Sequence, residues 1–399
     1  MTEARFLAWP GVPGTDRAQG PGIARVTPPS DRAFHHAAVT GGSPQAMGLA
    51  VALDRAGVRV TLIEEDDHDA RRVGDILAKA GAGAGITITT DPAIARRADL
   101  LVAAPASGTA GLVPVLRDAA PDALLVLMGQ APLPDDLPPR IAARLVRIDS
   151  AAPPPAIALI EIVAPAADAT TQVRADALAL LLGASAVHTP VFIAAPLLAR
   201  MEDIAEDLIF RGATPWQVDE ALEAFGFSLG PCAAQDLRGL DLAYARHRRE
   251  DTSGTRRVPC PVLDRMVPEG RLGHKGGVGW YRYPGGGGRV IDPLIEDLAR
   301  EEAYFAGITP RPLSDDTLRH RTVLALIDAG AELLAAGVPA RVIDRVSIAA
   351  LGFPLAHGGL MTFAEKLGLA RVLADLKTLA LEDSRFAPSD ALLSIGDPA

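Results

Sequence analysis

The chain has 399 residues, of which 49% are hydrophobic and 22% charged, so it is long enough for two or three domains with sizeable cores. A formal net charge of −10 argues against a broad basic face that would bind nucleic acid or an anionic membrane. The two cysteines, Cys232 and Cys260, exclude a disulfide framework and a thiolate metal site. We therefore expect no metal, no nucleic-acid partner, no membrane span and no signal peptide, which is typical of a cytoplasmic protein.

The first half of the chain alternates short apolar runs with helical stretches. Residues 1–35, rich in Gly and Pro without a period, precede this pattern and predict a flexible tail. Strands are predicted over 35–40, 59–64, 98–105, 122–128 and 158–165, and helices over 47–57 and 71–81. Such alternation predicts βαβ units and a mostly parallel sheet, in a Rossmann-like α/β domain over residues 36–188.

After Pro190 strands largely disappear from the pattern. A helical apolar face over residues 197–208 is followed by Gly212, which predicts the end of that helix. Thr214 is predicted to cap the next helix, with Pro215 at its first position.

The helical part of the chain repeats itself. The stretch "AEDLIFRGATPWQVDEALEAFGFSLGP…DLRGLD" aligns with "GAELLAAGVPARVIDRVSIAALGFPLAHGG…EKLGLA". The matched pairs include Gly212 with Gly337, Asp219 with Asp344, Gly226 with Gly352, and Gly239 with Gly368. This predicts two copies of one helical unit, over residues 189–290 and 315–395.

The stretch "VTGGSPQAMGLAVALDRAGVRVTLIE", residues 39–64, has the outline of a dinucleotide-binding unit. The three positions of the G-x-G-x-x-G turn are Gly41, Ser43 and Ala46, and Glu64 ends the second strand, where an acid binds the ribose of NAD. Ala is a common substitute at the third position. Ser43 places a side chain where phosphate oxygens come close, so an ordinary βαβ crossover kept only for the fold is the alternative interpretation.

Several long motifs resemble the 3-hydroxyacyl-CoA dehydrogenase family. They are "FGFSLGP…DLRGLD", "EGRLGHKGGVGWYRYP" and "LGFPLAHGGLMTFAEKLGL". The duplicated helical half is similar to the dehydrogenase portion of multifunctional β-oxidation proteins. The resemblance implies a Rossmann-like NAD-binding domain followed by two repeated all-α C-terminal domains of that family. It also implies NAD-dependent oxidation of a 3-hydroxyacyl-CoA, with a His as base, a Glu that orients it, and Ser and Asn that hold the substrate oxygen.

The catalytic positions that the resemblance implies are mostly substituted. The family's "HFFNP…LVEVI" matches "DSAAPPPAIALIEIV", which keeps the orienting acid as Glu161 but has Asp149 at the base position and Ala152 at the Asn position. The family's Ser turn matches residues 128–131, which contain no hydroxyl, and its substrate-side Asn is Ala195. A positioned base is worth roughly 10²–10⁴ in rate, so these changes bear directly on activity.

Two functions follow from this pattern. The first is an NAD-dependent 3-hydroxyacyl-CoA dehydrogenase of fatty-acid metabolism in which Asp149, near Glu161, acts as the base. The second is a catalytically silent relative that binds acyl-CoA, NAD or a β-oxidation partner protein. The residues leave the choice open. His188, His357 and Lys275 are interpreted as turn or surface residues.

Overall fold

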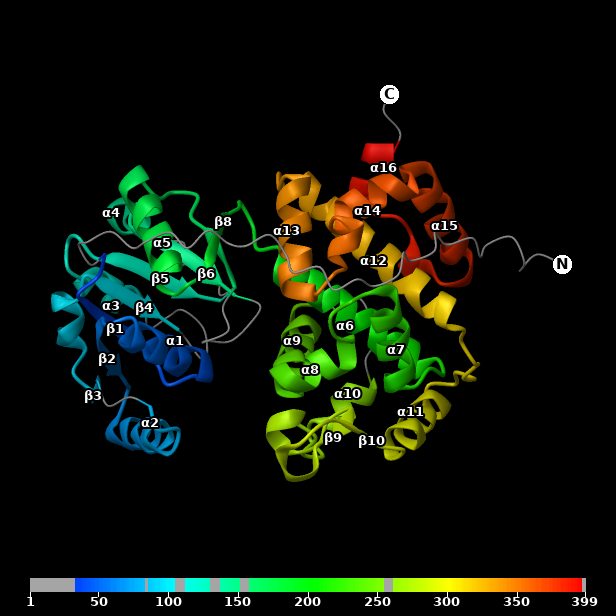
Figure 1. The fold of residues 1–399 in the computed structure, drawn as a ribbon, viewed down its shortest axis with the longest axis horizontal. Coiled ribbons are helices and arrows are strands. Elements are labelled where there is room, and N and C mark those ends of the chain that lie inside the picture. The colour runs from blue at the N-terminus through cyan, green and yellow to red at the C-terminus, as the bar shows by residue number, and fades with distance from the viewer. Residues whose placement is uncertain are drawn as a thin grey trace. The chain divides into compact units, whose positions relative to one another are not determined.

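The computed structural model describes residues 33–82, 85–104, 112–129, 137–150, 158–254 and 261–396. The described residues form two compact units, which divide between Ile193 and Ala194. The first unit is α/β and the second is helical (Figure 1). Phe34 is only 1% exposed and belongs to the core of the first unit, while residues 1–32 of the expected tail lie outside the described residues.

The first unit is built on an eight-stranded sheet in the order β3-β2-β1-β4-β5-β6-β7-β8. The strands are β1 (His36–Thr40), β2 (Arg59–Ile63), β3 (Ile86–Thr89), β4 (Leu100–Ala103), β5 (Leu124–Met128), β6 (Leu145–Asp149), β7 (Leu159–Val163) and β8 (Ser185–His188). Strands β1 to β6 are parallel, β7 is antiparallel to β6, and β8 is parallel to β7. The predicted, mostly parallel sheet is confirmed, although β3, β6 and β8 were not predicted as separate strands.

Helices cover both faces of this sheet. They are α1 (Pro44–Arg55), α2 (Asp67–Lys79), the 3₁₀ helix η1 (Pro92–Arg97), α3 (Leu112–Asp118), α4 (Pro139–Ala142) and α5 (Ala169–Leu181). Successive residues of a strand point to opposite faces. Accordingly Val39 packs in one apolar core with side chains of α1, α2 and α5, whereas Ala38 packs in a second core with η1, α3 and α4. A sheet buried on both faces explains the near-continuous apolar runs in the sequence.

The second unit is almost entirely helical. Its helices are α6 (Ala194–Phe210), α7 (Pro215–Phe225), α8 (Pro231–Arg238), α9 (Leu240–Ser253), α10 (Pro261–Met266), α11 (Leu294–Phe305), α12 (Asp315–Ala335), α13 (Ala340–Leu351), α14 (Leu360–Leu367), α15 (Leu369–Glu382) and α16 (Asp390–Gly396). Short 3₁₀ segments are η2 (His274–Gly276), η3 (Pro284–Gly286), η4 (Leu355–His357) and η5 (Ser384–Phe386), and β9 (Tyr281–Arg282) pairs with β10 (Val290–Ile291). The predicted start of α7 is confirmed, because the Thr214 hydroxyl accepts the Gln217 N–H at 3.2 Å with Pro215 at the first position.

Two runs of this unit share local geometry. Helices α7 and α13 both end at a left-handed glycine, Gly226 and Gly352. On α7, the Asp219 carboxylate accepts N–H groups at the start of α8, from Cys232 at 2.8 Å. On α13, the Asp344 carboxylate accepts N–H groups at the start of α14, from Met361 at 2.6 Å. The same acid therefore caps a later helix in each run.

Within the described ranges, the helices are too short or too polar for any of them to cross a membrane.

Candidate functional site

The turn after β1 lies at the point where the order of the sheet reverses. Strands β2 and β4 flank β1 on either side, and ligands of α/β sheets bind outside the carboxyl ends of strands at such a switch point. Gly41 has a φ of +88°, and a Cβ there would lie 2.9 Å from the carbonyl oxygen of Ala104, just after β4. Gly41 is therefore required both by its backbone conformation and by the close approach of the two strand ends.

Glu64 lies against this turn. A Cβ at Gly42 would overlap Oε1 of Glu64 and a methyl of buried Val73, so the glycine permits the approach. Glu64 is 7% exposed, and burial raises the pKa of its carboxyl above the ordinary value. Its Oε1 is buried without a hydrogen-bond partner among the described residues. A buried acceptor of this kind can accept a hydrogen bond from a hydroxyl group of a ribose. Glu64 therefore suits the ribose of NAD, which is the role predicted for it from the sequence.

The start of α1 is less suited to a pyrophosphate. Ser43 is the N-cap, and its hydroxyl accepts the N–H of Ala46 at 3.2 Å. Pro44 occupies the first helical position and has no N–H to offer. A phosphate at the start of a helix is bound by free N–H groups of the first turn. Among the first three helical positions, only Gln45 has an N–H group that is left for a phosphate. Ser43 was identified from the sequence as a weakness of this turn and Pro44 was not, although the missing N–H of a proline follows directly from the sequence.

Asp149 and Glu161 lie opposite each other on neighbouring strands. Asp149 ends β6, and the antiparallel register pairs it directly with Glu161 on β7. Side chains of directly opposite residues point to the same face, with Cβ atoms roughly 4.5–5.5 Å apart. Glu161 is 1% exposed, and its Oε2 accepts the N–H of Ile193 at 2.6 Å. The structure thus brings the two predicted catalytic residues together.

Arg147 shares this face and was not identified from the sequence. Val146 and Ile148 belong to the core on the other side, so Arg147 and Asp149 point the same way. The Arg147 guanidinium lies over the ring of Phe192 at 5.2 Å from its centroid. Its Nε is buried without a hydrogen-bond partner among the described residues. Only its position in the folded sheet singles it out from the chain's other arginines.

The remaining predicted residues have ordinary surroundings where they are described. Ala152 and residues 130–131 lie outside the described residues, and Ala195 is in the first turn of α6. His188 pairs with Asp176 at 2.7 Å on the surface, His357 stacks on Phe225, and Lys275 pairs with Asp241 at 2.5 Å. Over the described ranges no cluster of His, Cys, Asp or Glu could hold a metal ion.

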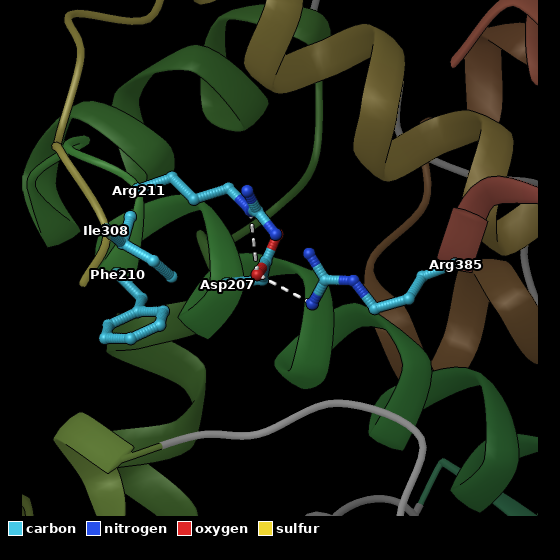
Figure 2. A pocket seen from close by; sticks show the side chains of 5 residues that line it. All are labelled: Asp207, Phe210, Arg211, Ile308 and Arg385. Carbon is cyan, nitrogen blue, oxygen red and sulfur yellow. Dashed lines mark hydrogen bonds and ion pairs between the residues drawn. The ribbon is translucent and has the colours of Figure 1, made fainter. Parts of the chain in front are cut away.

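A pocket of about 270 Å³ lies in the helical unit, lined by Asp207, Phe210, Arg211, Ile308 and Arg385 (Figure 2). Both guanidiniums pair with the buried Asp207 carboxylate, from Arg211 at 2.9 Å and from Arg385 at 2.8 Å. Their charge is therefore already matched by protein groups, and the pocket has no unpaired cation to attract an anionic ligand.

The curated relatives agree on one family. Residues 192–283 match the family model described as 3-hydroxyacyl-CoA dehydrogenase, C-terminal domain. The chain is similar to the peroxisomal bifunctional enzyme of Danio rerio, 35% identical over 207 residues, which are 48% of this chain and 29% of the relative. The human peroxisomal bifunctional enzyme is 32% identical over 213 residues, 48% of this chain and 30% of the relative. The fatty acid oxidation complex subunit alpha of Vibrio cholerae is 29% identical over 203 residues, 50% and 28% of the two chains. Residues 192–283 thus carry the C-terminal domain of the 3-hydroxyacyl-CoA dehydrogenase family.

Solved structures agree with this family in fold. The 3-hydroxybutyryl-CoA dehydrogenase from Escherichia coli K12 has a TM-score of 0.68 at 20% identity, covering 91% of this chain and 98% of that one. The dehydrogenase part of a multifunctional enzyme from C. elegans has a TM-score of 0.63 at 19% identity, covering 92% and 93%. Each alignment to the curated relatives spans less than a third of the relative's own length. The chain thus matches only part of those longer proteins.

Proposed function

We propose that this protein is an NAD-dependent 3-hydroxyacyl-CoA dehydrogenase of fatty-acid metabolism, with Asp149 in the role of the base. The observation that carries the proposal is the direct pairing of Asp149 with Glu161 across β6 and β7. The match of residues 192–283 to the family's C-terminal domain, and the similarity to the β-oxidation relatives, support the reaction class. The geometry supports a carboxylate where proton uptake is needed.

Bound NAD would supply the acceptor for a hydride from C3 of the substrate. Asp149 would take the proton of the 3-hydroxyl while the C3–H electron pair leaves, so that the alcohol becomes a ketone. A second carboxylate directly opposite favours proton uptake by the first, because two adjacent negative charges repel each other. The Ile193 N–H holds Glu161 in place, so Glu161 acts on Asp149 as a positioning residue.

The cofactor would be held by the turn after β1. Glu64 would accept the ribose hydroxyls, which favours NAD over NADP, and the Gln45 N–H would contact the pyrophosphate. The Ser43 cap and Pro44 leave few donors for the phosphates, so the affinity for NAD is expected to be modest.

The proposed dehydrogenase activity is tested by measuring the oxidation of NADH, from its absorbance at 340 nm, in the presence of acetoacetyl-CoA. Asp149→Asn should lower turnover by roughly 100-fold or more, because a positioned base is worth about 10²–10⁴ in rate. Asp176→Asn, which changes a surface carboxylate of the same unit, is the matched control and should leave turnover unchanged. Equal turnover by both variants would contradict the role of Asp149.

The Ser43 cap specifically favours the second candidate function, a catalytically silent relative that binds acyl-CoA, NAD or a β-oxidation partner protein. Calorimetric titration with NAD and with acetoacetyl-CoA separates the two. Binding without turnover would support the silent relative. Absence of both turnover and NAD binding would rule out the dehydrogenase.

Two organisational points belong to the same proposal. The matched caps of Asp219 and Asp344, and the matched glycines Gly226 and Gly352, support two copies of one helical domain within the second unit. The location in the cytoplasm stays a prediction, since the Danio rerio and human relatives are named as peroxisomal enzymes.

A further inference from the structure

Exposed apolar side chains gather on helix α11 and on the strand just before it. Five of the fourteen large apolar side chains that are exposed among the described residues lie within residues 290–305. They are Val290 and Ile291 of β10, and Leu294, Tyr304 and Phe305 of α11 (Figure 1). Apolar side chains scattered singly over a surface need no explanation, whereas a gathering of this kind marks an interaction site.

Helix α11 buries one side and carries these side chains on the other. Its buried side consists of Ile295, Leu298, Ala299 and Ala303. On the exposed side, Leu294 stands at the beginning of the helix and is 65% exposed. Tyr304 and Phe305 stand at its end and are 78% and 72% exposed, with ring centroids 5.9 Å apart. The exposed side of α11 therefore has an aliphatic end and an aromatic end.

Opposite charges lie between these two ends. Arg300 pairs with Asp297 of its own helix at 2.9 Å, and the two side chains are 64% and 71% exposed. The midpoint between Asp297 and Arg300 lies one residue from the midpoint between Leu294 and Phe305. A rotation of half a turn about this midpoint exchanges the aliphatic end with the aromatic end and the acid with the base. The surface of α11 is therefore complementary to itself.

We propose that α11 pairs antiparallel with α11 of a second copy of this chain, about a two-fold axis through the middle of the helix. Leu294 of each copy then lies over the aromatic end of the other, and Arg300 of each copy faces Asp297 of the other. A two-fold interface uses the same patch on both subunits and therefore requires a self-complementary surface, as α11 has. The pairing goes beyond the proposed function and does not depend on hydride transfer.

The size of the patch suits a weak dimer. A Phe or Tyr side chain can bury about 150–250 Å², so the aromatic ends of two copies, mostly exposed, supply roughly 600 Å². The aliphatic ends that cover them raise the total to roughly 1,000 Å², which is at the lower limit for a specific interface. We therefore expect a dissociation constant in the micromolar range.

Two other occupants fit this surface less well. A membrane surface favours basic residues around an apolar patch, whereas the acids Glu296, Asp297 and Glu301 lie between the two ends of α11. A different protein would not require the patch to match itself in both charge and apolar surface. A second copy is the occupant that accounts for both.

The test is sedimentation velocity of the full chain from about 1 to 200 µM, which brackets a micromolar dissociation constant. The wild type should pass from one copy to two. Phe305→Asp should weaken the dimer by roughly 100-fold, because the two-fold axis removes the aromatic anchor twice. Leu381→Asp, which changes an 89% exposed residue of α15 in the same unit, is the matched control and should leave the dimer unchanged. Leu294→Asp replaces Phe305→Asp if that variant does not fold.

A monomeric wild type over this range, or a Phe305→Asp variant that dimerises as the wild type does, would overturn the proposal. A monomeric wild type that floats with phosphatidylcholine vesicles would also overturn it and would assign the patch to a membrane surface.

Two charge variants test the antiparallel arrangement. Asp297→Arg and Arg300→Asp each place like charges opposite each other at both symmetric contacts, so each variant alone should dimerise roughly 10-fold more weakly. In an equal mixture every cation of one variant faces an anion of the other, so the mixture should recover the affinity of the wild type. A mixture that sediments like its two separate components would overturn the pairing of α11 with itself.

Discussion

The Ser43→Gly substitution is expected to tighten the binding of NADH. In the wild type the Ser43 hydroxyl occupies the Ala46 N–H at 3.2 Å. Glycine releases that N–H, and a hydrogen bond from it to a charged phosphate is worth about 1.5–3 kcal/mol. Glycine is also a fair N-cap, so the cost to the helix is only a few tenths of a kcal/mol. The net gain corresponds to a dissociation constant lower by roughly 10- to 100-fold.

Fluorescence titration of the full chain with NADH measures this effect. Ser314→Gly is the matched control, because Ser314 caps α12 in the helical unit and accepts the Thr317 N–H at the same 3.2 Å. It should lose a similar small amount of stability and leave NADH binding unchanged. If Ser43→Gly binds NADH no more tightly than the wild type, the hydroxyl does not compete with a phosphate and the account of the turn is wrong.

Two further substitutions test the stability of the site and of the helical unit. Gly42→Ala should cost about 1–3 kcal/mol in urea unfolding, because its Cβ overlaps Glu64 and Val73, and Glu64→Ala in the same chain should recover part of the loss. Burial raises the pKa of Asp219 to about 6 from 3.8, so its folded form binds the proton more tightly than its unfolded form. The stabilisation that protonated Asp219 contributes to the free energy of unfolding is therefore fully present below about pH 4. It is lost as the pH rises through 6, which lowers the free energy of unfolding by about 3 kcal/mol. Asp219→Asn should remove this slope from the pH dependence of unfolding; an identical slope in wild type and variant would contradict the assignment.

Much of the sheet was predictable because its strands are buried on both faces and read as apolar runs. The exceptions have physical reasons. Strand β6 contains Arg147 in its middle, which interrupts the run, and β3 lies at the sheet edge with no fully buried residue. The beginning of α7 was predictable to the residue, since Thr214 and Pro215 determine it locally.

The site was predictable only in part. Glu64 follows from its place at the end of the second strand, and Glu161 from its motif. The pairing of Asp149 with Glu161 depends on the antiparallel register, and a slip of one residue would turn one side chain to the opposite face. The unmatched charge of Arg147 depends on what the fold leaves near it. Such facts are non-local, so sequence patterns do not contain them.

The central claim is that this chain transfers a hydride to and from C3 of an acyl-CoA. The direct measurement incubates the protein with acetoacetyl-CoA and NADH that carries deuterium at both C4 positions, and determines the mass of the product by mass spectrometry. The account predicts 3-hydroxybutyryl-CoA with one deuterium at C3, and a strongly reduced yield with Asp149→Asn. Recovery of unchanged acetoacetyl-CoA, or of product without deuterium, would contradict it.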